Sequence, residues 1–167
     1  MTSSQEIDIQ LSGYVPGAIG KVTELHATYY HEHWGFDASF ETQVGSELSE
    51  FISRFHKDVD GFWLASMEGT FAGAIAIDGH QTQGEGARLR WFIVAPEFQT
   101  RGVGGLLIRE AVDFCRKAGH KSLYLWTFEG LDAARSLYER EGFWLSEEHS
   151  VEQWGTKLKE QKFEINL

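Results

Sequence analysis

A glycine-rich segment at residues 99–105 carries residue types that could bind a phosphate group. It lies between a run of bulky residues and a helical pattern, so its glycines fall at the first turn of the helix. A helix N-terminus presents unpaired N–H groups and a partial positive charge, and glycine lets an anion come close to them. An arginine in the segment could add a charge-assisted hydrogen bond. The candidate phosphate-binding turn consists of Gln99, Thr100, Arg101, Gly102, Val103, Gly104 and Gly105.

Two well-known nucleotide motifs do not fit this segment. A Walker A loop needs a longer glycine spacing that ends in Gly-Lys-Ser/Thr, and the dinucleotide fingerprint needs a third glycine where this chain has Leu107. A glycine-rich turn that only allows close helix packing remains the alternative to phosphate binding.

A cluster of histidine and aromatic residues at positions 29–37 is the second candidate for chemistry. His31 and His33, together with His26, could be read as metal ligands. Alternate histidines at a helix end, with no cysteine and no second ligand pair, are a weak zinc pattern, so we expect no metal. The aromatic residues could line an acceptor pocket or could be plain core. The candidate pocket residues are Trp34, Phe36 and Trp126, with Phe40, Trp91 and Phe128 beside them.

The glycine turn is positioned by the strand before it and the helix after it. Residues 89–94 are almost all bulky or β-branched, which is typical of a strand covered on both faces, and Pro96 ends this strand. From Val103 the apolar residues recur at helical spacing as far as residue 118. Gly119 then supplies a helix stop.

The remaining chain predicts a mixed α/β sheet. Residues 7–11 read as a first strand, and two helical stripes follow at residues 19–29 and 44–55, the second capped by Asp37 or Ser39. Glu68 and Gly69 predict a two-residue hairpin turn. A strand at residues 122–127 should run parallel to residues 89–94, because a helix connects the two. The other expected elements are strands at 62–67, 70–78, 143–147 and 162–167 and a helix at 131–141.

Length and composition indicate one ordinary globular domain, residues 1–167. The chain has 42% hydrophobic and 24% charged residues and no linker-like stretch. No apolar run approaches the roughly 18 residues that a membrane-spanning helix needs, and the first residues lack the pattern of a signal peptide. We therefore expect a cytoplasmic protein that does not bind membranes. The single cysteine, Cys115, falls on the apolar face of its helix and is expected in the core.

The net charge of −10 argues against nucleic acid as a partner, because that binding draws on clustered lysine and arginine. An acidic surface would instead concentrate cationic substrates such as amines, although solubility alone explains such a charge.

Two motifs resemble one known family. The pattern Gln99-x-x-Gly102-x-Gly104, after a strand that ends at residues 93–96, is similar to the pyrophosphate-binding motif of the GNAT family of N-acetyltransferases. The segment at residues 134–143, with Tyr138 on a helix and Gly-Phe after it, resembles the family's helix-then-strand signature. The amino-acid sequence looks most similar to the acetyltransferase domains often fused behind MarR-type regulators. The resemblance covers nearly the whole chain, most strongly residues 87–143.

The resemblance implies a fold, a cofactor and an activity. It implies the GNAT fold, a mixed and mostly antiparallel sheet of about seven strands with about four flanking helices, splayed beside its central strand. It implies acetyl-CoA as co-substrate, with the pyrophosphate on the glycine turn and the pantetheine arm paired with the backbone of Phe92, Ile93 and Val94. Tyr138 would donate a proton to the departing thiolate. The acceptor would be a primary amine, and a C-terminal strand could pair between the subunits of a homodimer. If the aromatic cluster is a pocket, its side chains would suit an arylalkylamine or another small amine with an apolar body.

The general base is left open by the sequence. Arg88 occupies a position where many relatives carry a carboxylate, so the candidates are Glu32, His33, Glu85 and His80, or a water relay. Leu131 stands where relatives often have an asparagine that contacts the cofactor. These departures keep a non-catalytic acyl-CoA-binding sensor open as an alternative. A small α/β interaction domain is a third hypothesis.

Overall fold

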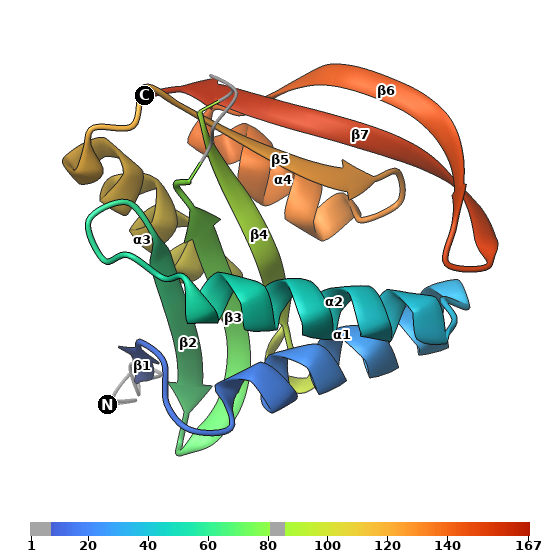
Figure 1. Cartoon of the computed structure of the whole chain (residues 1–167), viewed down its shortest axis with the longest axis horizontal. Helices are drawn as coiled ribbons and strands as arrows, with labels where there is room; N and C mark the ends of the chain where they lie inside the picture. The colour runs from blue at the N-terminus through green and yellow to red at the C-terminus, as the bar shows by residue number, and fades with distance from the viewer. Residues whose placement is uncertain (1–7, 81–85) are drawn as a thin grey trace, which may run out of the picture.

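A seven-stranded sheet in the order β1-β2-β3-β4-β5-β7-β6 forms the centre of the protein (Figure 1). The structure is a computed structural model that describes residues 8–80 and 86–167. The expected first strand therefore lies partly, and Glu85 wholly, outside the described residues. The strands are β1 (Ile9–Ser12), β2 (Gly61–Met67), β3 (Thr70–Asp78), β4 (Ala87–Val94), β5 (Ser122–Phe128), β6 (Trp144–Gln153) and β7 (Thr156–Asn166). The α-helices are α1 (Ala18–Trp34), α2 (Ala38–Ser53), α3 (Val103–Ala118) and α4 (Asp132–Glu141), and a 3₁₀ turn, η1 (Pro96–Phe98), follows β4.

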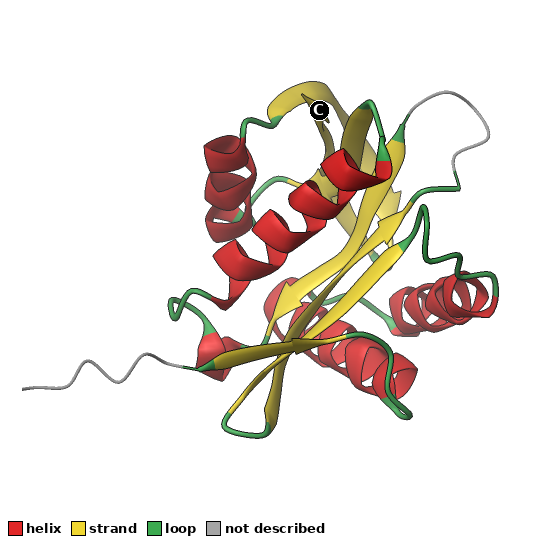
Figure 2. Ribbon diagram, turned by 90° about the vertical axis from the view of Figure 1, so that its left-hand side faces the viewer, coloured by secondary structure: helices red, strands yellow, loops and turns green. Residues whose placement is uncertain are grey.

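The helices cover both faces of the sheet (Figure 2). One core cluster gathers residues of α3, α4 and the strands on one face, and a second gathers α1, α2 and the opposite face. Asp37 caps α2 as expected, since its carboxylate accepts a hydrogen bond of 3.0 Å from the N–H of Ser39. Cys115 is fully buried in the first cluster, and burial raises the pKa of its thiol to about 12. The predicted mixed sheet of about seven strands with four helices is confirmed within the described residues.

The parallel pair β4–β5 is open for most of its length. Five of the six neighbouring strand pairs are antiparallel, and β4 and β5 are parallel, as the helical crossover predicted. These two strands pair only where Ala87 and Arg88 face Leu123 and Tyr124. Beyond that point they diverge, so the edge of β4 from Leu89 to Val94 makes no ladder with β5. A gap in the sheet therefore borders the central strand.

A β-bulge in β4 changes the direction of its side chains. The register with β3 shifts between Ala74 and Ala76, and Trp91 has a positive φ of 48°. Bulges turn a strand and re-aim its side chains. The indole of Trp91 packs against Phe51 of α2, with ring centroids 5.4 Å apart, and Phe92 faces Tyr138 of α4. The prediction of a regular strand missed this bulge, because nothing in a run of bulky residues marks one.

The C-terminal hairpin is longer than predicted. The expected strands at residues 143–147 and 162–167 are parts of β6 and β7, which continue to a two-residue turn at Trp154 and Gly155. Both turn residues have positive φ, 53° and 85°. Because β6 is rich in polar residues and exposed along nearly its whole length, its sequence lacks the alternation that would have marked it. In Figure 1 the hairpin reaches the ends of α1 and α2, and Trp154 packs there on Phe36 with ring centroids 4.9 Å apart.

Candidate active site

A cavity of about 1050 Å³ spans the gap between β4 and β5. Residues of α1, α2 and the β6–β7 hairpin line it on one face of the sheet, and residues of α3, α4 and the glycine turn line it on the other. The backbone edge of β4 that lacks a β5 partner borders it, and Phe92, Ile93 and Val94 are among its lining residues. The cavity is thus lined by residues from both faces of the sheet and borders the open edge of β4.

The glycine turn forms one end of this cavity. The N–H of Leu106 donates to the carbonyl of Gly102 at 3.1 Å, which leaves the N–H groups of residues 103–105 without a partner inside α3. The side-chain amide of Gln99 donates to the carbonyl of Val94 at 3.3 Å and so ties the turn to β4. The turn residues that line the cavity are Gln99, Thr100, Gly102, Gly104 and Gly105. Such a set of free N–H groups at a helix N-terminus suits a phosphate.

Two of the predicted turn residues lie elsewhere. Arg101 is exposed and does not line the cavity, and its guanidinium lies 5.9 Å from the ring of Phe98. The side chain of Val103 is buried in the core. Gly104 also serves packing, since a Cβ there would lie only 2.9 Å from a methyl carbon of Leu137. Gly104 therefore allows close packing of the helix, as the alternative interpretation expected, and it also lines the cavity.

Arg109 is the arginine that faces the cavity beside the turn, and the sequence analysis missed it. A Cβ added to Gly105 would lie 3.3 Å from its Nη1, and Arg109 lines the cavity. Its position four residues after Gly105 puts both on one side of the helix, which was the available sequence signal.

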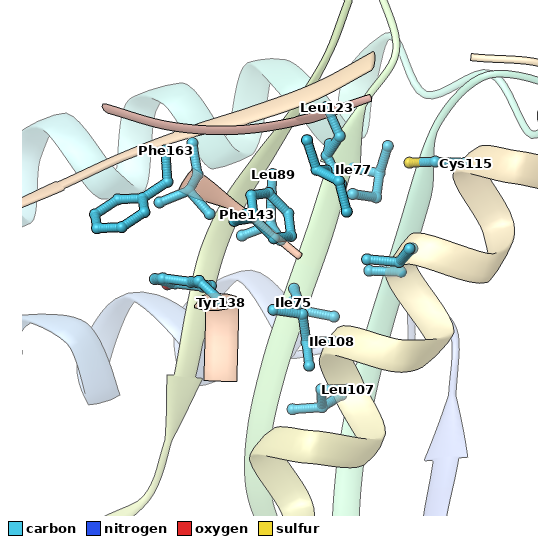
Figure 3. Packing of buried hydrophobic residues seen from close by; sticks show 14 of the residues in the cluster. Ile75, Ile77, Leu89, Leu107, Ile108, Cys115, Leu123, Tyr138, Phe143 and Phe163 are labelled. Carbon is cyan, nitrogen blue, oxygen red and sulfur yellow. The ribbon is translucent and has the colours of Figure 1, made fainter. Parts of the chain in front are cut away.

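Tyr138 lies in the cavity wall, on the α4 side of the gap. Its ring is 5% exposed and packs among Phe92, Phe143 and Phe163, each with its ring centroid 5.8 to 5.9 Å away. Figure 3 shows Tyr138 beside Phe143 and Phe163. Burial raises the pKa of the phenol, and repulsion from Tyr30 adds to the shift. A phenol with a raised pKa stays protonated at neutral pH.

The α1 wall of the cavity holds a buried histidine, His26, and a half-buried tyrosine, Tyr30, that the sequence did not assign to it. The Nδ1 atom of His26 lies 2.8 Å from the carbonyl of Val22, and burial lowers the pKa of the ring to about 4. Since a carbonyl only accepts, Nδ1 carries the proton and Nε2 has a free lone pair. The ring of Tyr30 stacks 6.2 Å from His26, and burial raises the pKa of its phenol. His31 instead bonds the carbonyl of Phe36 at 3.0 Å.

The general-base candidates from the sequence differ in whether they line the cavity. His33 lines the cavity, exposed and packed 4.5 Å from the ring of Tyr29. Glu32 is exposed and does not line it. His80 also lies outside it, with its Nδ1 3.0 Å from the carboxylate of Asp60. Glu85 is outside the described residues.

The aromatic pocket candidates also differ in whether they line the cavity. Trp34 and Trp126 line the cavity. Trp34 packs edge-on against Phe128 at 4.9 Å and so closely on Gly130 that a Cβ there would lie 2.3 Å from the indole. Phe36 does not line the cavity: it is 2% exposed and forms core between α1, α2 and the hairpin.

Charged residues of β4 and α2 line the cavity near the start of the gap. Arg90 donates to the carboxylate of Glu47 and lies 3.4 Å from that of Asp78, while Arg88 lines the cavity two residues earlier. Burial, followed by repulsion from Arg88, lowers the pKa of Arg90. Arg88 lies in the cavity wall near the start of the gap. The sequence of β4 contains no aspartate or glutamate.

Comparison with known proteins places this architecture in a family. The sequence profile of the acetyltransferase (GNAT) family matches residues 20–143. An uncharacterised N-acetyltransferase of Methanocaldococcus jannaschii is 28% identical over 130 residues, which cover 75% of this chain and 57% of that relative's length.

Solved structures share the fold across nearly the whole chain. A putative acetyltransferase from Salmonella typhimurium, determined with its cofactor acetyl-CoA, superposes with a TM-score of 0.74 at 14% identity and covers 95% of this chain and 94% of its own. Spermidine N-acetyltransferase from Vibrio cholerae, in complex with CoA and spermine, gives a TM-score of 0.70 at 20% identity, with 95% of each chain covered. The family profile spans most of the sequence and includes the glycine turn and Tyr138. The chain therefore belongs to the acetyltransferase (GNAT) family.

Proposed function

We propose that this protein is an acetyl-CoA-dependent N-acetyltransferase that moves the acetyl group directly to a primary amine in a ternary complex. The observation that carries the proposal is the cavity through the β4–β5 gap, which joins the free N–H groups of the glycine turn to the phenol of Tyr138. The co-substrate is the one named for the Salmonella typhimurium structure, and an amine acceptor is named for the Vibrio cholerae enzyme.

The co-substrate would bind on the α3 and α4 side of the gap. The pyrophosphate would accept hydrogen bonds from the N–H groups of residues 103–105, with Arg109 as a charged partner. The pantetheine amides would pair with the open edge of β4 at Phe92, Ile93 and Val94, as an added strand does. This pairing would aim the thioester at the centre of the gap.

The acceptor would enter from the α1 and α2 side. Its nitrogen attacks the thioester carbonyl carbon, the C–S bond breaks, and the thiolate takes the proton of the Tyr138 hydroxyl. The amine loses a proton in the same turnover. Of the sequence candidates with a described place, His33 lines the cavity and Glu32 does not, so we assign the role of proton acceptor to His33. Trp34 and Trp126 would hold an apolar or aromatic body of the amine.

The test is a turnover assay with acetyl-CoA and a panel of primary amines, with free thiol and acetylated product both measured. We expect product to accumulate with at least one amine and thiol release to depend on that amine, beyond slow hydrolysis of acetyl-CoA alone. If the protein binds CoA but acetylates no amine in the panel, the proposal is wrong and the acyl-CoA sensor becomes the better description.

We further propose a subgroup of the family, a domain organisation and a cellular location for this protein. The sequence similarity to acetyltransferase domains fused to MarR-type regulators supports a link to that group. We also propose that residues 1–167 form one domain that acts in the cytoplasm. Within the described residues no helix is long and apolar enough to cross a membrane. The net charge of −10 supports the absence of nucleic acid as a partner. The exposed edge strand β6 could pair two subunits, and light scattering in solution would test such a homodimer.

A further inference from the structure

Arg88 lies at the point where the gap in the sheet begins. It faces Tyr124 in the last paired position of β4 and β5, and beyond this position the two strands separate. Arg88 lines the cavity, and its Nε is buried without a hydrogen-bond partner among the described residues. A buried guanidinium nitrogen without a partner is costly in a folded protein, so the position calls for a ligand acceptor.

The nearby carboxylates are already engaged by other groups. Asp78 is the cross-strand neighbour of Arg88, but it is held by Arg54 at 2.7 Å and by Arg90 at 3.4 Å. Glu47 accepts its hydrogen bond from Arg90. These four groups form a balanced set of two guanidinium groups and two carboxylates. Among the described residues, Arg88 therefore adds a positive charge to this wall of the cavity that neither Asp78 nor Glu47 pairs with.

The other carboxylates of the cavity wall make no ion pair with Arg88 in the described part of the chain. Among the described residues, Glu160 and Asp132 are the acidic side chains that line the cavity besides Glu47. Glu160 lies 3.1 Å from the Nε2 of His149. Asp132 begins α4, on the side of the sheet that carries the glycine turn. One positive charge with a planar fork of donors matches a monoanionic carboxylate, which accepts two parallel hydrogen bonds.

We propose that the acceptor is a small amino-carboxylate, whose carboxylate is bound by Arg88 while its amine points toward the thioester. The inference rests on the proposed function and adds the substrate class. Strand rise puts Phe92 roughly 13 Å along β4 from Arg88, so the anion end and the acetyl end lie apart on one strand. Trp126, on the cavity wall beside the gap, would hold the apolar part between them. Binding of the carboxylate would fix the position of the amine relative to the thioester. An amine without a carboxylate would bind in many orientations.

The test compares matched amines that differ only in this charge. Phenylalanine, tryptophan and leucine are each assayed beside their carboxamides with saturating acetyl-CoA, and binding of the same pairs to the CoA-loaded protein is measured by calorimetry. We expect kcat/KM to be about 10- to 100-fold higher for at least one amino acid than for its amide, mostly through KM. In Arg88→Gln this preference should vanish, and Arg88→Lys should retain part of it.

Arg116→Gln is the control for net charge. Arg116 is exposed on α3, 3.8 Å from Asp113, and does not line the cavity, so the preference should survive its replacement. Turnover with equal rates for acids and amides, or a preference that persists in Arg88→Gln, overturns the inference and leaves the acetyltransferase standing. Arg88-dependent binding of the acid without any turnover supports the anion site and overturns the proposed function. If no acid binds better than its amide, the inference is wrong.

Discussion

The ring of Tyr138 lies 5.9 Å from the ring of Phe92, centroid to centroid, so the tyrosine of α4 packs directly on the strand that borders the gap. Phe92 follows the bulged residue Trp91, and it faces α4 because the bulge separates its direction from that of Arg90. The position of the phenol thus depends on the path of β4 as well as on α4. Loss of the bulge would move both walls of the cavity.

Tyr138→Phe tests the proposed proton donor. The change keeps the ring and its packing, so we expect unchanged CoA affinity and a fall in kcat of about 100-fold or more. Since burial raises the pKa of the phenol, the donor should stay protonated and kcat should not fall up to about pH 10, where an ordinary tyrosine would titrate. A pH profile with stopped-flow or thiol detection measures both effects. Turnover equal to that of the wild type would remove Tyr138 from the mechanism.

Arg109→Gln tests the side chain beside the glycine turn. A charge-assisted contact with the pyrophosphate should be worth about 10-fold in affinity, so we expect the Kd for CoA to rise by that factor while kcat at saturation changes little. Arg116→Gln removes the same charge from an exposed site on the same helix and serves as the control. Calorimetry with CoA decides the matter, and equal affinities for both variants would exclude Arg109 from the phosphate site.

His26 should make stability depend on pH. Burial holds the pKa of the native ring at about 4, below its ordinary value of 6.5, so between these values the unfolded chain binds a proton that the native protein does not. The free energy of unfolding should therefore fall as pH drops through this window, by roughly 3 kcal/mol in total.

The variant His26→Gln removes this titration. Urea denaturation at a series of pH values should show a shallower loss of stability for the variant than for the wild type, whatever its stability at neutral pH. Equal slopes would mean that His26 does not titrate in this manner.

Trp154 anchors the C-terminal hairpin to the helices. Its Nε1 donates to the side-chain oxygen of Gln43 at 2.9 Å, and its ring packs on Phe36 and Phe40 at 4.9 and 5.0 Å. Trp154→Ala should lower the free energy of unfolding by about 3 kcal/mol and raise the KM of the acceptor, because the residue also lines the cavity.

Trp144→Ala is the matched control in the same hairpin. Its side chain is 45% exposed, so its removal should change stability by about 0.5 kcal/mol or less. Chemical denaturation measures both variants, and similar losses would contradict the anchoring role of Trp154.

The sequence by itself determined most of the local elements and indicated the family. The run of bulky residues before Pro96, the helical stripe from Val103 and the turn at Glu68 and Gly69 each appear as predicted, because local periodicity and turn chemistry fix them. The parallel pairing of β4 and β5 also followed, since a helical crossover permits it. The spacing of Gln99, Gly102 and Gly104 with Tyr138 indicated the family that the comparisons support.

Only the tertiary structure decided which residues meet in the cavity. Phe36 and Trp34 are two residues apart and equally aromatic, yet one is core and the other lines the cavity, because the direction of a side chain depends on the element packed against it. Arg101, which precedes α3, and Arg109 within α3 differ in the same way. The Nε of Arg88, which lacks a partner among the described residues, could not be read from the sequence either, since distant carboxylates pair with other arginines. Local patterns fix elements, whereas burial and charge pairing depend on contacts between residues far apart in the chain.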